Sequence, residues 1–507
     1  MVQIKFDTTY NEPMNIDPAI FREYDIRGVA GNEFDKKIVE EYEKLYGPFP
    51  GVTLTLRAAE AIGQAYGTII KRAGGKEVIV GHELRPFADE LTGAFILGVR
   101  KTGCAVTDLG TALTPIVYFI TAFLRFDGGV NVTGSHNIYF FNGFKLMKKD
   151  VWPLFGEELK KMRQMISAND LLDGELGEYK KIDGYKVYRE YFLSHIKLRR
   201  KLKVVIDTGN GSAGIFAPDL FAALGCEVIG LYIEPDATFP NHIPDPEARQ
   251  GLVDLQKRVI AEKADIGVAF DADGDRAGFI TEKGEYIDGD LILLLLSKDV
   301  LERNPGKKIL YDVKCSQLLA ELIPKYGGIP LMHRTGHAPI KETLRKDKDI
   351  ILGGEVSGHV YFVEDYFKID DGLWAAGKVL EILSLGTDSF SSLFADIPIR
   401  VRTPEIKLPC ADEKKFEIVD QIKKDLGSNF KISDIDGARI QLSGTGWGLI
   451  RASNTSPYLT IRVEGENEAE ALHVKNILAD ELEKFPEIGD RLNRSAVATL
   501  TGKLGWV

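Results

Sequence analysis

The chain has 507 residues, of which 44% are hydrophobic and 27% are charged. This composition is typical of a globular protein, and the length predicts about three to four domains. The formal net charge of −11 argues against general binding to nucleic acid or to an anionic membrane, although it leaves room for a local basic pocket.

The cysteines and the apolar segments indicate the compartment. Four cysteines are scattered without a CxxC pair, which is typical of reduced thiols rather than of a disulfide framework or a zinc site. The first ten residues contain no apolar signal segment, and the longest apolar run, Leu291–Leu296, is too short to span a bilayer. We therefore expect a cytoplasmic protein.

One pattern recurs three times along the chain: a strand, a turn, an amphipathic helix, a glycine stop and a second strand. The copies begin near residues 76, 202 and 307, and each has the form of a βαβ unit. Because the copies are about a domain apart, they predict three similar α/β domains rather than a solenoid.

The pattern changes beyond residue 400, where strands and helices alternate without the βαβ form. We predict strands at Thr403–Leu408, Arg439–Leu442, Trp447–Ile450 and Tyr458–Glu464, and helices at Phe416–Leu426 and Ala469–Phe485. This mixture predicts a smaller α+β domain.

Three carboxylates follow a predicted buried strand, Ile266–Phe270. Asp271, Asp273 and Asp275 alternate with small residues, and Arg276 comes next. Open α/β sheets bind ligands at the carboxyl ends of their strands. Carboxylate oxygens suit Mg²⁺ or Mn²⁺, and the arginine suits an anion such as a phosphate.

A second polar cluster is formed by Thr133–Asn137 and Asn142–Lys145. Its spacing alone fits a polar loop after a strand as well as it fits a catalytic site. If the site is catalytic, Ser135 is the candidate nucleophile or phosphoryl carrier, and a serine hydroxyl needs a base or a metal to react. His136 and Lys145 are the candidates for proton transfer and for neutralising charge.

Together these clusters resemble the phosphohexomutase superfamily, and within it the phosphomannomutase/phosphoglucomutase family. Three further stretches agree with that family in order: Phe21–Gly28, Gly354–His359 and Arg451–Thr455. The resemblance implies an α/β fold with three similar domains of mixed sheets and a C-terminal α+β domain around a central cleft. The expected domains are 1–182 with the phosphoserine loop, 183–295 with the metal loop, 296–400 with the sugar loop and 401–507 with the phosphate loop.

The resemblance also implies the roles of the reactive groups. Ser135 would carry a phosphoryl group and bind Mg²⁺ together with Asp271, Asp273 and Asp275. Phosphoryl transfer is catalysed mainly by positioning and by neutralising charge. Arg276 and Lys145 would hold negative charge, either His136 or Lys145 would handle the proton, and Arg22 would support the site from the first domain.

The remaining implied contacts bind the substrate. Glu355, Ser357 and His359 would hold the sugar hydroxyls, with Lys314 and His337 as further contacts from the same domain. The loop carrying Arg451, Ser453, Asn454 and Thr455 would clamp the phosphate that does not react.

The implied reaction interconverts hexose 6-phosphate and hexose 1-phosphate through a 1,6-bisphosphate. Mannose and glucose phosphates are the expected substrates, and glucose 1,6-bisphosphate or mannose 1,6-bisphosphate is the expected activator. Phosphoglucosamine mutases typically carry glutamine where Val356 stands and alanine at Gly134, so that alternative is less favoured. The expected partners are small sugar phosphates, and the expected state is a monomer or a small homo-oligomer.

Three alternative interpretations, each as another class of protein, stay open. The run Gly209–Gly214 fits G-x-G-x-x-G after a strand, and Glu234 follows 20 residues later, as in dinucleotide-binding oxidoreductases. The aspartate run also resembles a calcium loop with Glu282 at position twelve, although Arg276 replaces its usual glycine. A sugar-phosphate binder without catalysis is disfavoured by the presence of every catalytic group.

Two features depart from the family pattern. The residue after Ser-His-Asn is often proline in the family and is Ile138 here. The acidic and aromatic stretch 32–55 is longer than expected, and its Phe34–Tyr46 portion has helical potential. We expect this stretch to be a lid or an oligomer contact, without a choice between the two.

Overall fold

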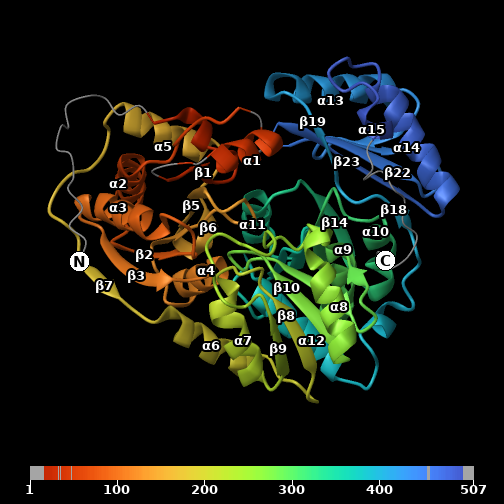
Figure 1. The fold of residues 1–507 in the computed structure, drawn as a ribbon, viewed down its shortest axis with the longest axis horizontal. Coiled ribbons are helices and arrows are strands. Elements are labelled where there is room, and N and C mark those ends of the chain that lie inside the picture. The colour runs from red at the N-terminus through yellow and green to blue at the C-terminus, as the bar shows by residue number, and fades with distance from the viewer. Residues whose placement is uncertain (1–15, 32–33, 35, 47, 454–456, 495–507) are drawn as a thin grey trace.

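The computed structural model describes residues 16–31, 34, 36–46, 48–453 and 457–494. Four β-sheets follow one another along the chain, each with its own helices (Figure 1). No described helix has both the length and the apolar character needed to cross a membrane.

The first sheet has the strand order β1-β5-β4-β2-β3-β7, and β6 pairs with β5. Its strands are β1 Ile26–Val29, β2 Glu77–His82, β3 Ala105–Thr111, β4 Gly128–Val132, β5 Phe141–Lys148, β6 Trp152–Pro153 and β7 Tyr179–Lys181. The helices of this region are α1 Lys36–Tyr46, α2 Leu56–Arg72, α3 Ala88–Lys101, α4 Thr114–Phe123, α5 Glu157–Ser167 and α6 Gly184–His195.

The second and third sheets share one topology: β12-β11-β10-β8-β9 and β17-β16-β15-β13-β14. The second region contains β8 Lys203–Asp207, β9 Glu227–Leu231, β10 Ile266–Phe270, β11 Ala277–Thr281, β12 Tyr286–Ile287, α7 Ala213–Leu224 and α8 Val253–Glu262. The third contains β13 Lys308–Asp312, β14 Ile329–His333, β15 Ile350–Gly354, β16 Val360–Phe362, β17 Ile369–Asp370, α9 Gly289–Arg303, α10 Leu318–Leu322, α11 His337–Lys346 and α12 Gly372–Ser384.

The repeat predicted from the sequence is confirmed by the strand pairing. In each of the first three sheets, a central strand (β2, β8 or β13) pairs in parallel with two neighbours. An antiparallel strand (β5, β11 or β16) then extends the sheet. The three domains are therefore similar α/β units with mixed sheets, as expected.

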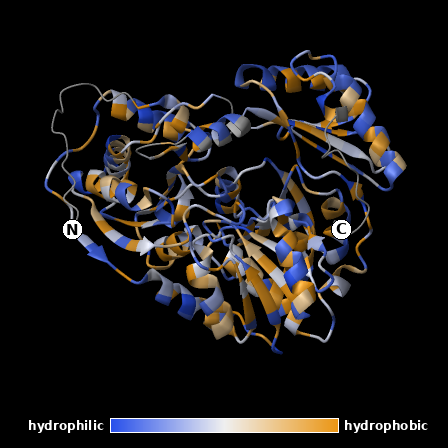
Figure 2. Ribbon diagram, viewed as in Figure 1, coloured by the Kyte–Doolittle hydropathy of each residue, from blue (hydrophilic) through white to orange (hydrophobic). Residues whose placement is uncertain are grey.

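The central strands are buried on both faces, which explains their continuous apolar sequences. Every residue of β10 is buried, and Figure 2 shows the strands of this region as largely hydrophobic. Local signals set the helix ends. Asp183 accepts a hydrogen bond from the Lys186 amide at the start of α6, and Gly225 ends α7 with a φ of 107°.

The fourth sheet is antiparallel, which confirms the predicted C-terminal α+β domain. Its elements are β18 Val401–Arg402, β19 Ile406–Pro409, β20 Lys431–Ser433, β21 Ala438–Gln441, β22 Trp447–Ala452, β23 Tyr458–Gly465, α13 Asp412–Gly427, α14 Glu468–Leu482 and α15 Arg491–Arg494. The strand predicted at Thr403–Leu408 was wrong at its start. Two short strands, β18 and β19, flank Pro404, which has no N–H to donate to a sheet.

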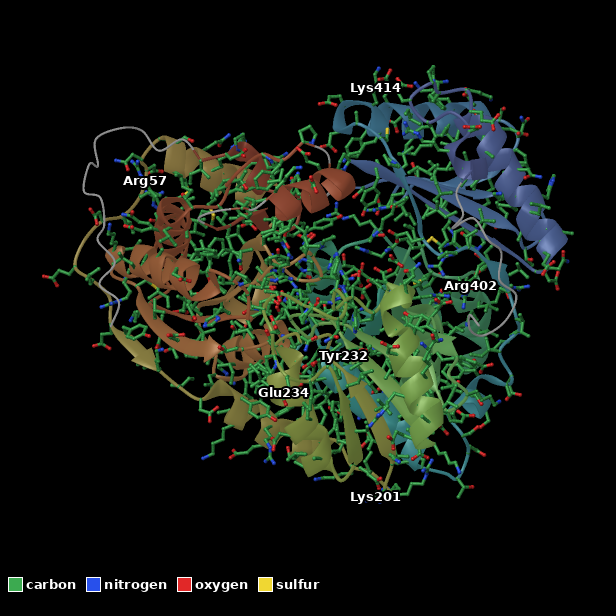
Figure 3. The ribbon with its side chains drawn as sticks, in the orientation of Figure 1. Arg57, Lys201, Tyr232, Glu234, Arg402 and Lys414 are labelled. Atoms are coloured by element: carbon green, nitrogen blue, oxygen red, sulfur yellow. The ribbon has the colours of Figure 1, made fainter. Side chains whose placement is uncertain are left out.

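The fourth domain has a separate core, whereas one large core joins the first three domains. Polar contacts connect it to its neighbours. Arg402, labelled in Figure 3, pairs with Asp288 at 2.6 Å, and Arg439 donates hydrogen bonds to the carbonyls of Val313 and Cys315.

Two of the predicted domain boundaries, after residues 182 and 400, fall between elements. The third, after residue 295, falls inside α9. Because α9 packs against β15 of the third sheet, we propose that the second domain ends ahead of Gly289.

Candidate active site

The three aspartates after β10 form a buried cluster. Asp271, Asp273 and Asp275 are each 0% exposed, and one oxygen from each lies within 4.8 Å of the others. Gly274 allows the turn between them with a φ of 73°. One oxygen on each aspartate has no hydrogen-bond partner among the described residues. Buried, unpartnered carboxylate oxygens at this spacing fit a hard divalent cation.

Lys145 reaches this cluster from β5 of the first domain. Its Nζ lies 2.7 Å from Asp273 Oδ2 and 2.5 Å from Asp275 Oδ2. Burial alone would lower the pKa of Lys145, but the two aspartates outweigh it and raise that pKa well above its usual value. Burial likewise opposes ionisation of Asp273, yet the lysine holds the pKa of Asp273 below its usual range. The lysine is therefore a permanent cation at the carboxylates.

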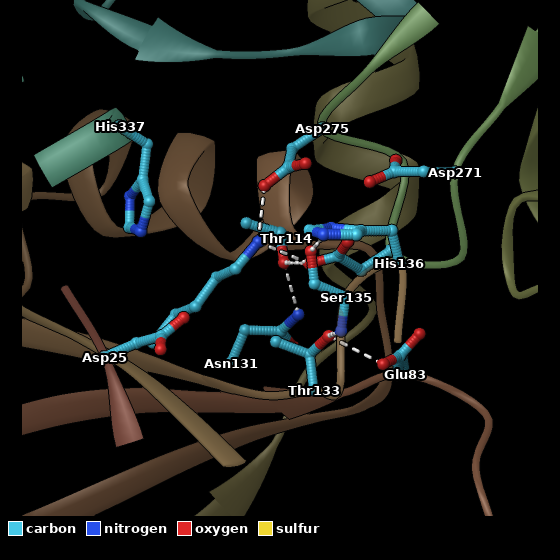
Figure 4. Close-up of polar contacts among 12 residues, drawn as sticks. Asp25, Glu83, Thr114, Asn131, Thr133, Ser135, His136, Asp271, Asp275 and His337 are labelled. Carbon is cyan, nitrogen blue, oxygen red and sulfur yellow. Dashed lines mark hydrogen bonds and ion pairs between the residues drawn. The ribbon is translucent and has the colours of Figure 1, made fainter. Parts of the chain in front are cut away.

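Two further polar residues support the cluster and were missed by the sequence analysis. Thr114, at the start of α4, donates its hydroxyl to Asp273 Oδ2 at 2.5 Å. Asn131 on β4 donates to Thr114 Oγ1 at 2.6 Å (Figure 4). No local pattern in the sequence distinguished either residue as part of the site.

Ser135 lies in the loop that follows β4. It is 3% exposed, and its φ of 51° is a left-handed conformation that serine rarely adopts. Its Oγ lies 3.2 Å from His136 Nδ1. Burial, followed by the charges of Arg276 and Arg27, lowers the pKa of His136 well below its usual value. The neutral imidazole is therefore the favoured form of His136 near pH 7.

Glu83 and Arg85 directly follow β2 and hold the Ser135 loop in place by hydrogen bonds. Glu83 Oε1 accepts hydrogen bonds from Thr133 Oγ1 and from the Gly134 amide, each at 2.6 Å. Arg85 pairs with Glu83 and donates to several loop carbonyls, including that of Ser135. A left-handed residue persists only where its surroundings fix it, and this ion pair supplies such contacts.

Arg276 connects the aspartate cluster with the third domain. Its amide donates to Asp271 Oδ1 at 3.1 Å, and its Nε donates to His359 Nε2 at 3.0 Å. Since arginine has no acceptor, His359 Nε2 must accept, which leaves the ring proton on Nδ1. That nitrogen lies 3.1 Å from Asp370 Oδ2. His359 therefore contacts the predicted charge-holding arginine directly.

The other predicted sugar contacts of the third domain are Glu355, Ser357 and His337. Both oxygens of Glu355 are engaged, by the Gly336 amide at 3.0 Å and by the Tyr361 hydroxyl at 2.6 Å. Ser357 is buried. The His337 ring lies 6.2 Å from that of Tyr24 in the first domain and 6.5 Å from that of His359. The structure thus brings His337 and His359 together, and their role in binding sugar stays a prediction.

The remaining predicted substrate contacts, Lys314 and the phosphate loop of the fourth domain, lie among polar contacts between the third and fourth domains. Lys314 pairs with Glu405 at 2.9 Å across the two domains. Arg451 Nε lies 2.7 Å from Asp436 Oδ2, the same oxygen that accepts the Thr335 amide of the third domain at 3.0 Å. Ser453 is buried at the end of β22. The predicted residues Asn454 and Thr455 lie outside the described residues.

Lys407 on β19 is a further cation that the sequence analysis missed. Glu405 directly precedes β19 and reaches Lys314. Burial would raise the pKa of Glu405, but the charges of Lys314 and then Lys407 lower it, so Lys407 lies near Glu405. Its side chain is exposed and makes no ion pair with any described residue, while its Nζ lies 5.5 Å from the Tyr458 ring centre. It is close enough to His136 to help lower the pKa of that histidine.

Arg22 is partly buried after the short helix Pro18–Ile20. Its guanidinium makes no ion pair with any described residue, so its predicted supporting role stays a prediction. The neighbouring pair Arg27 and Asp25, joined at 2.6 Å, lies closer to the reactive groups, since Arg27 influences the pKa of His136.

The structure gives local contacts for both rival motifs. In the glycine-rich run, a Cβ on Gly214 would meet the Ile233 carbonyl at 2.1 Å, so this glycine allows close packing. The calcium reading was wrong, because Glu282 turns away from the aspartates and accepts hydrogen bonds from Ser391.

Comparison with known families covers almost the entire fold. Residues 18–173, 186–284 and 288–400 match "Phosphoglucomutase/phosphomannomutase, alpha/beta/alpha" domains I, II and III, and residues 405–481 match the C-terminal domain of the same family. The chain belongs to the phosphoglucomutase/phosphomannomutase family.

Individual relatives agree with this assignment. A phosphomannomutase/phosphoglucomutase of Pseudomonas aeruginosa is 40% identical over 92% of this chain and 95% of its own. A phosphoglucomutase of Neisseria meningitidis is 35% identical over 94% of this chain and 99% of its own. A crystal structure of a family protein from Burkholderia thailandensis has a TM-score of 0.83 at 36% identity, covering 93% and 98% of the two chains. The resemblance inferred from the five motifs is confirmed.

Proposed function

We propose that this chain interconverts hexose 6-phosphate and hexose 1-phosphate through a phosphorylated Ser135 and a hexose 1,6-bisphosphate. The observation that carries the proposal is the meeting of a buried serine, three aspartates and a buried lysine from two domains. Positioning and charge neutralisation are what phosphoryl transfer requires.

The aspartate cluster supports a bound Mg²⁺. Asp271, Asp273 and Asp275 would hold it, with the phosphate on Ser135 completing the oxygen ligands. When bound, the cation would withdraw charge from the phosphoryl group. Arg276 and Lys145, both fixed by carboxylates, would hold the negative charge that develops on the phosphoryl oxygens.

The proton-transfer roles follow from the two environments. His136 is neutral and in contact with Ser135 Oγ, so we assign it as the proton acceptor. Lys145 keeps its proton because its pKa is raised, so we assign it as the fixed cation. The sequence left these two roles open.

The substrates would be small sugar phosphates of the mannose and glucose type. Glu355, Ser357 and His359, with Lys314 and His337, would bind the sugar, and the loop of Arg451, Ser453, Asn454 and Thr455 would bind its other phosphate. Glucose or mannose 1,6-bisphosphate would serve as activator. The four free, buried cysteines support a reducing compartment such as the cytoplasm.

Gly134 bears on the alternative of a phosphoglucosamine mutase. A Cβ at Gly134 would lie 2.3 Å from the Phe141 carbonyl and 2.5 Å from the Arg85 guanidinium carbon. The loop as built here therefore excludes the alanine typical of those enzymes. Together with Val356, this favours glucose and mannose phosphates.

A coupled assay tests the proposal with mannose 1-phosphate, glucose 1-phosphate and glucosamine 1-phosphate, each with catalytic glucose 1,6-bisphosphate. We expect turnover of the first two. Ser135→Ala should abolish turnover and remove a single phosphate from the intact mass, whereas Ser428→Ala, at an exposed serine after α13, should change neither. Undiminished activity of Ser135→Ala would overturn the mechanism.

A further inference from the structure

Four consecutive apolar residues, Ile138–Phe141, follow the reactive loop directly. They connect the Ser135 loop with β5, which carries Lys145. Ile138 and Phe140 are each 2% exposed and Phe141 is 9% exposed. Loop residues are usually at the surface, so another part of the chain must cover this run.

The cover comes from the long stretch 32–55 and its helix α1. Phe34, Ile38, Tyr42 and Phe49 pack with Ile138–Phe141 and Val29 in one apolar cluster. We call these nine residues the aromatic cluster: Val29, Phe34, Ile38, Tyr42, Phe49 and the four residues Ile138–Phe141. Figure 1 shows α1 at the edge of the first domain, outside its sheet and its other helices.

Ring contacts join the two halves of the aromatic cluster. The Tyr42 ring stacks on Phe141 with centres 5.9 Å apart, and lies 6.1 Å from Phe140 and 5.2 Å from Phe49. Phe34 contacts Phe49 at 5.1 Å and Phe140 at 6.1 Å, both edge to face. Such pairs are favourable geometries for aromatic side chains.

The main chain and Arg85 hold the other side of the same run. Arg85 Nη1 donates to the carbonyls of Ile138 at 2.7 Å and Phe141 at 3.2 Å. The Ala30 amide donates to the Phe140 carbonyl at 3.0 Å. The run is therefore held between hydrogen bonds to its backbone and rings packed on its side chains.

We propose that helix α1, together with Phe34 and Phe49, is a positioning element for Ser135 that acts through Ile138–Phe141. The rings of Phe34, Tyr42 and Phe49 fix the end of the loop, while Glu83 and Arg85 fix its beginning and backbone. With both ends fixed, Ser135 keeps its left-handed conformation. The lid and the oligomer contact expected from the sequence stay predictions beside this role.

The inference rests on the proposed role of Ser135, and it predicts a specific kinetic effect. Loosening the aromatic cluster should misplace the reactive hydroxyl, while the phosphate and sugar contacts of the third and fourth domains keep their own supports. A small misplacement of a reacting group can cost about 100-fold in rate. The turnover number should therefore fall while KM for the sugar phosphate stays unchanged.

The test uses Tyr42→Leu and Phe49→Leu, with Tyr42→Phe as the conservative variant and Phe367→Leu as the control. Phe367 is also partly buried and makes ring contacts with Phe119 and Tyr366 at 5.4 Å, but it lies outside the aromatic cluster. Steady-state kinetics and hydrogen exchange of residues 133–141 are measured on each full-length protein.

We expect kcat to fall about tenfold or more in both leucine variants at constant KM, with faster exchange at 133–141. Tyr42→Phe should keep near-native kcat and exchange, and Phe367→Leu should leave both unchanged. Native kcat in both leucine variants, or a fall in kcat with native exchange at 133–141, would overturn the inference. An active Ser135→Ala would instead overturn the proposed function, so the two failures are distinguishable.

Discussion

Lys145 Nζ lies 2.7 Å from Asp273 Oδ2, although 128 residues separate the two in the chain. The same ammonium also contacts Asp275. This lysine therefore connects the serine-bearing domain with the domain that carries the acidic cluster. It also neutralises carboxylates that would otherwise repel one another in a buried place.

Lys145→Met should have two opposite effects. Turnover should fall by about 100-fold or more, because a positioned cation at the reacting group is lost. Mn²⁺ binding should become tighter, because the ammonium no longer competes for Asp273 and Asp275. Coupled assays and calorimetric Mn²⁺ titration measure the two effects.

Lys148→Met is the matched control for that experiment. Lys148 lies on the same strand, but its ammonium pairs with Glu158, outside the site. It should show native turnover and native Mn²⁺ affinity. Weaker Mn²⁺ binding in Lys145→Met would contradict the competition between lysine and metal.

Arg85→Lys should slow the reaction without weakening substrate binding. A lysine cannot reproduce the guanidinium contacts to several carbonyls of the Ser135 loop at once. We expect kcat to fall about 10- to 100-fold with little change in KM. Arg100→Lys is the control, since Arg100 donates to Gly177 far from the loop. A raised KM with native kcat would show that Arg85 serves binding instead.

The sequence predicted the parts of the site that are local in the chain. The strand Ile266–Phe270 was predicted with its observed bounds, because a short apolar run bounded by polar residues is a strong signal. The serine loop and the aspartate run were found for the same reason. The three similar domains followed from the repeat.

Pairings between distant residues could not be predicted in the same way. Nothing local distinguishes Glu83 and Arg85 from other charged residues after a strand, since their role depends on a loop 50 residues away. In the sequence, Lys407 has the pattern of an ordinary exposed strand residue. Only the folded structure shows that it lies near His136 and Glu405. Stretch 32–55 showed helical potential, but only the packing of Tyr42 on Phe141 shows which surface it covers.

Lys407→Gln should weaken binding of the sugar phosphate. Lys407 is exposed, makes no ion pair with any described residue and lies near Glu405. A charge-assisted hydrogen bond to a phosphate contributes about 1.5–3 kcal/mol, so we expect KM to rise about tenfold or more. Lys431→Gln, on the exposed strand β20, is the control. An unchanged KM would show that Lys407 does not contact the substrate.

The last prediction concerns stability and pH at Asp371, which caps α12. Burial raises the pKa of Asp371 from 3.8 to about 6, although it accepts hydrogen bonds from the hydroxyls of Tyr188 and Tyr366. The folded protein therefore binds this proton more tightly than the unfolded chain does. The contribution of Asp371 to the free energy of unfolding should therefore be largest below about pH 4 and should be lost as the pH rises through about 6.

Asp371→Asn removes this titration. Relative to the wild type, the variant should gain about 2 kcal/mol of stability between pH 4 and pH 7. If the amide forms a weaker hydrogen bond than the carboxyl group, the resulting loss of stability is the same at both pH values. That loss therefore cancels when the two pH values are compared. The measurement is the difference in melting temperature between the two proteins at pH 4.5 and at pH 7. If that difference is the same at both pH values, Asp371 does not titrate in this window.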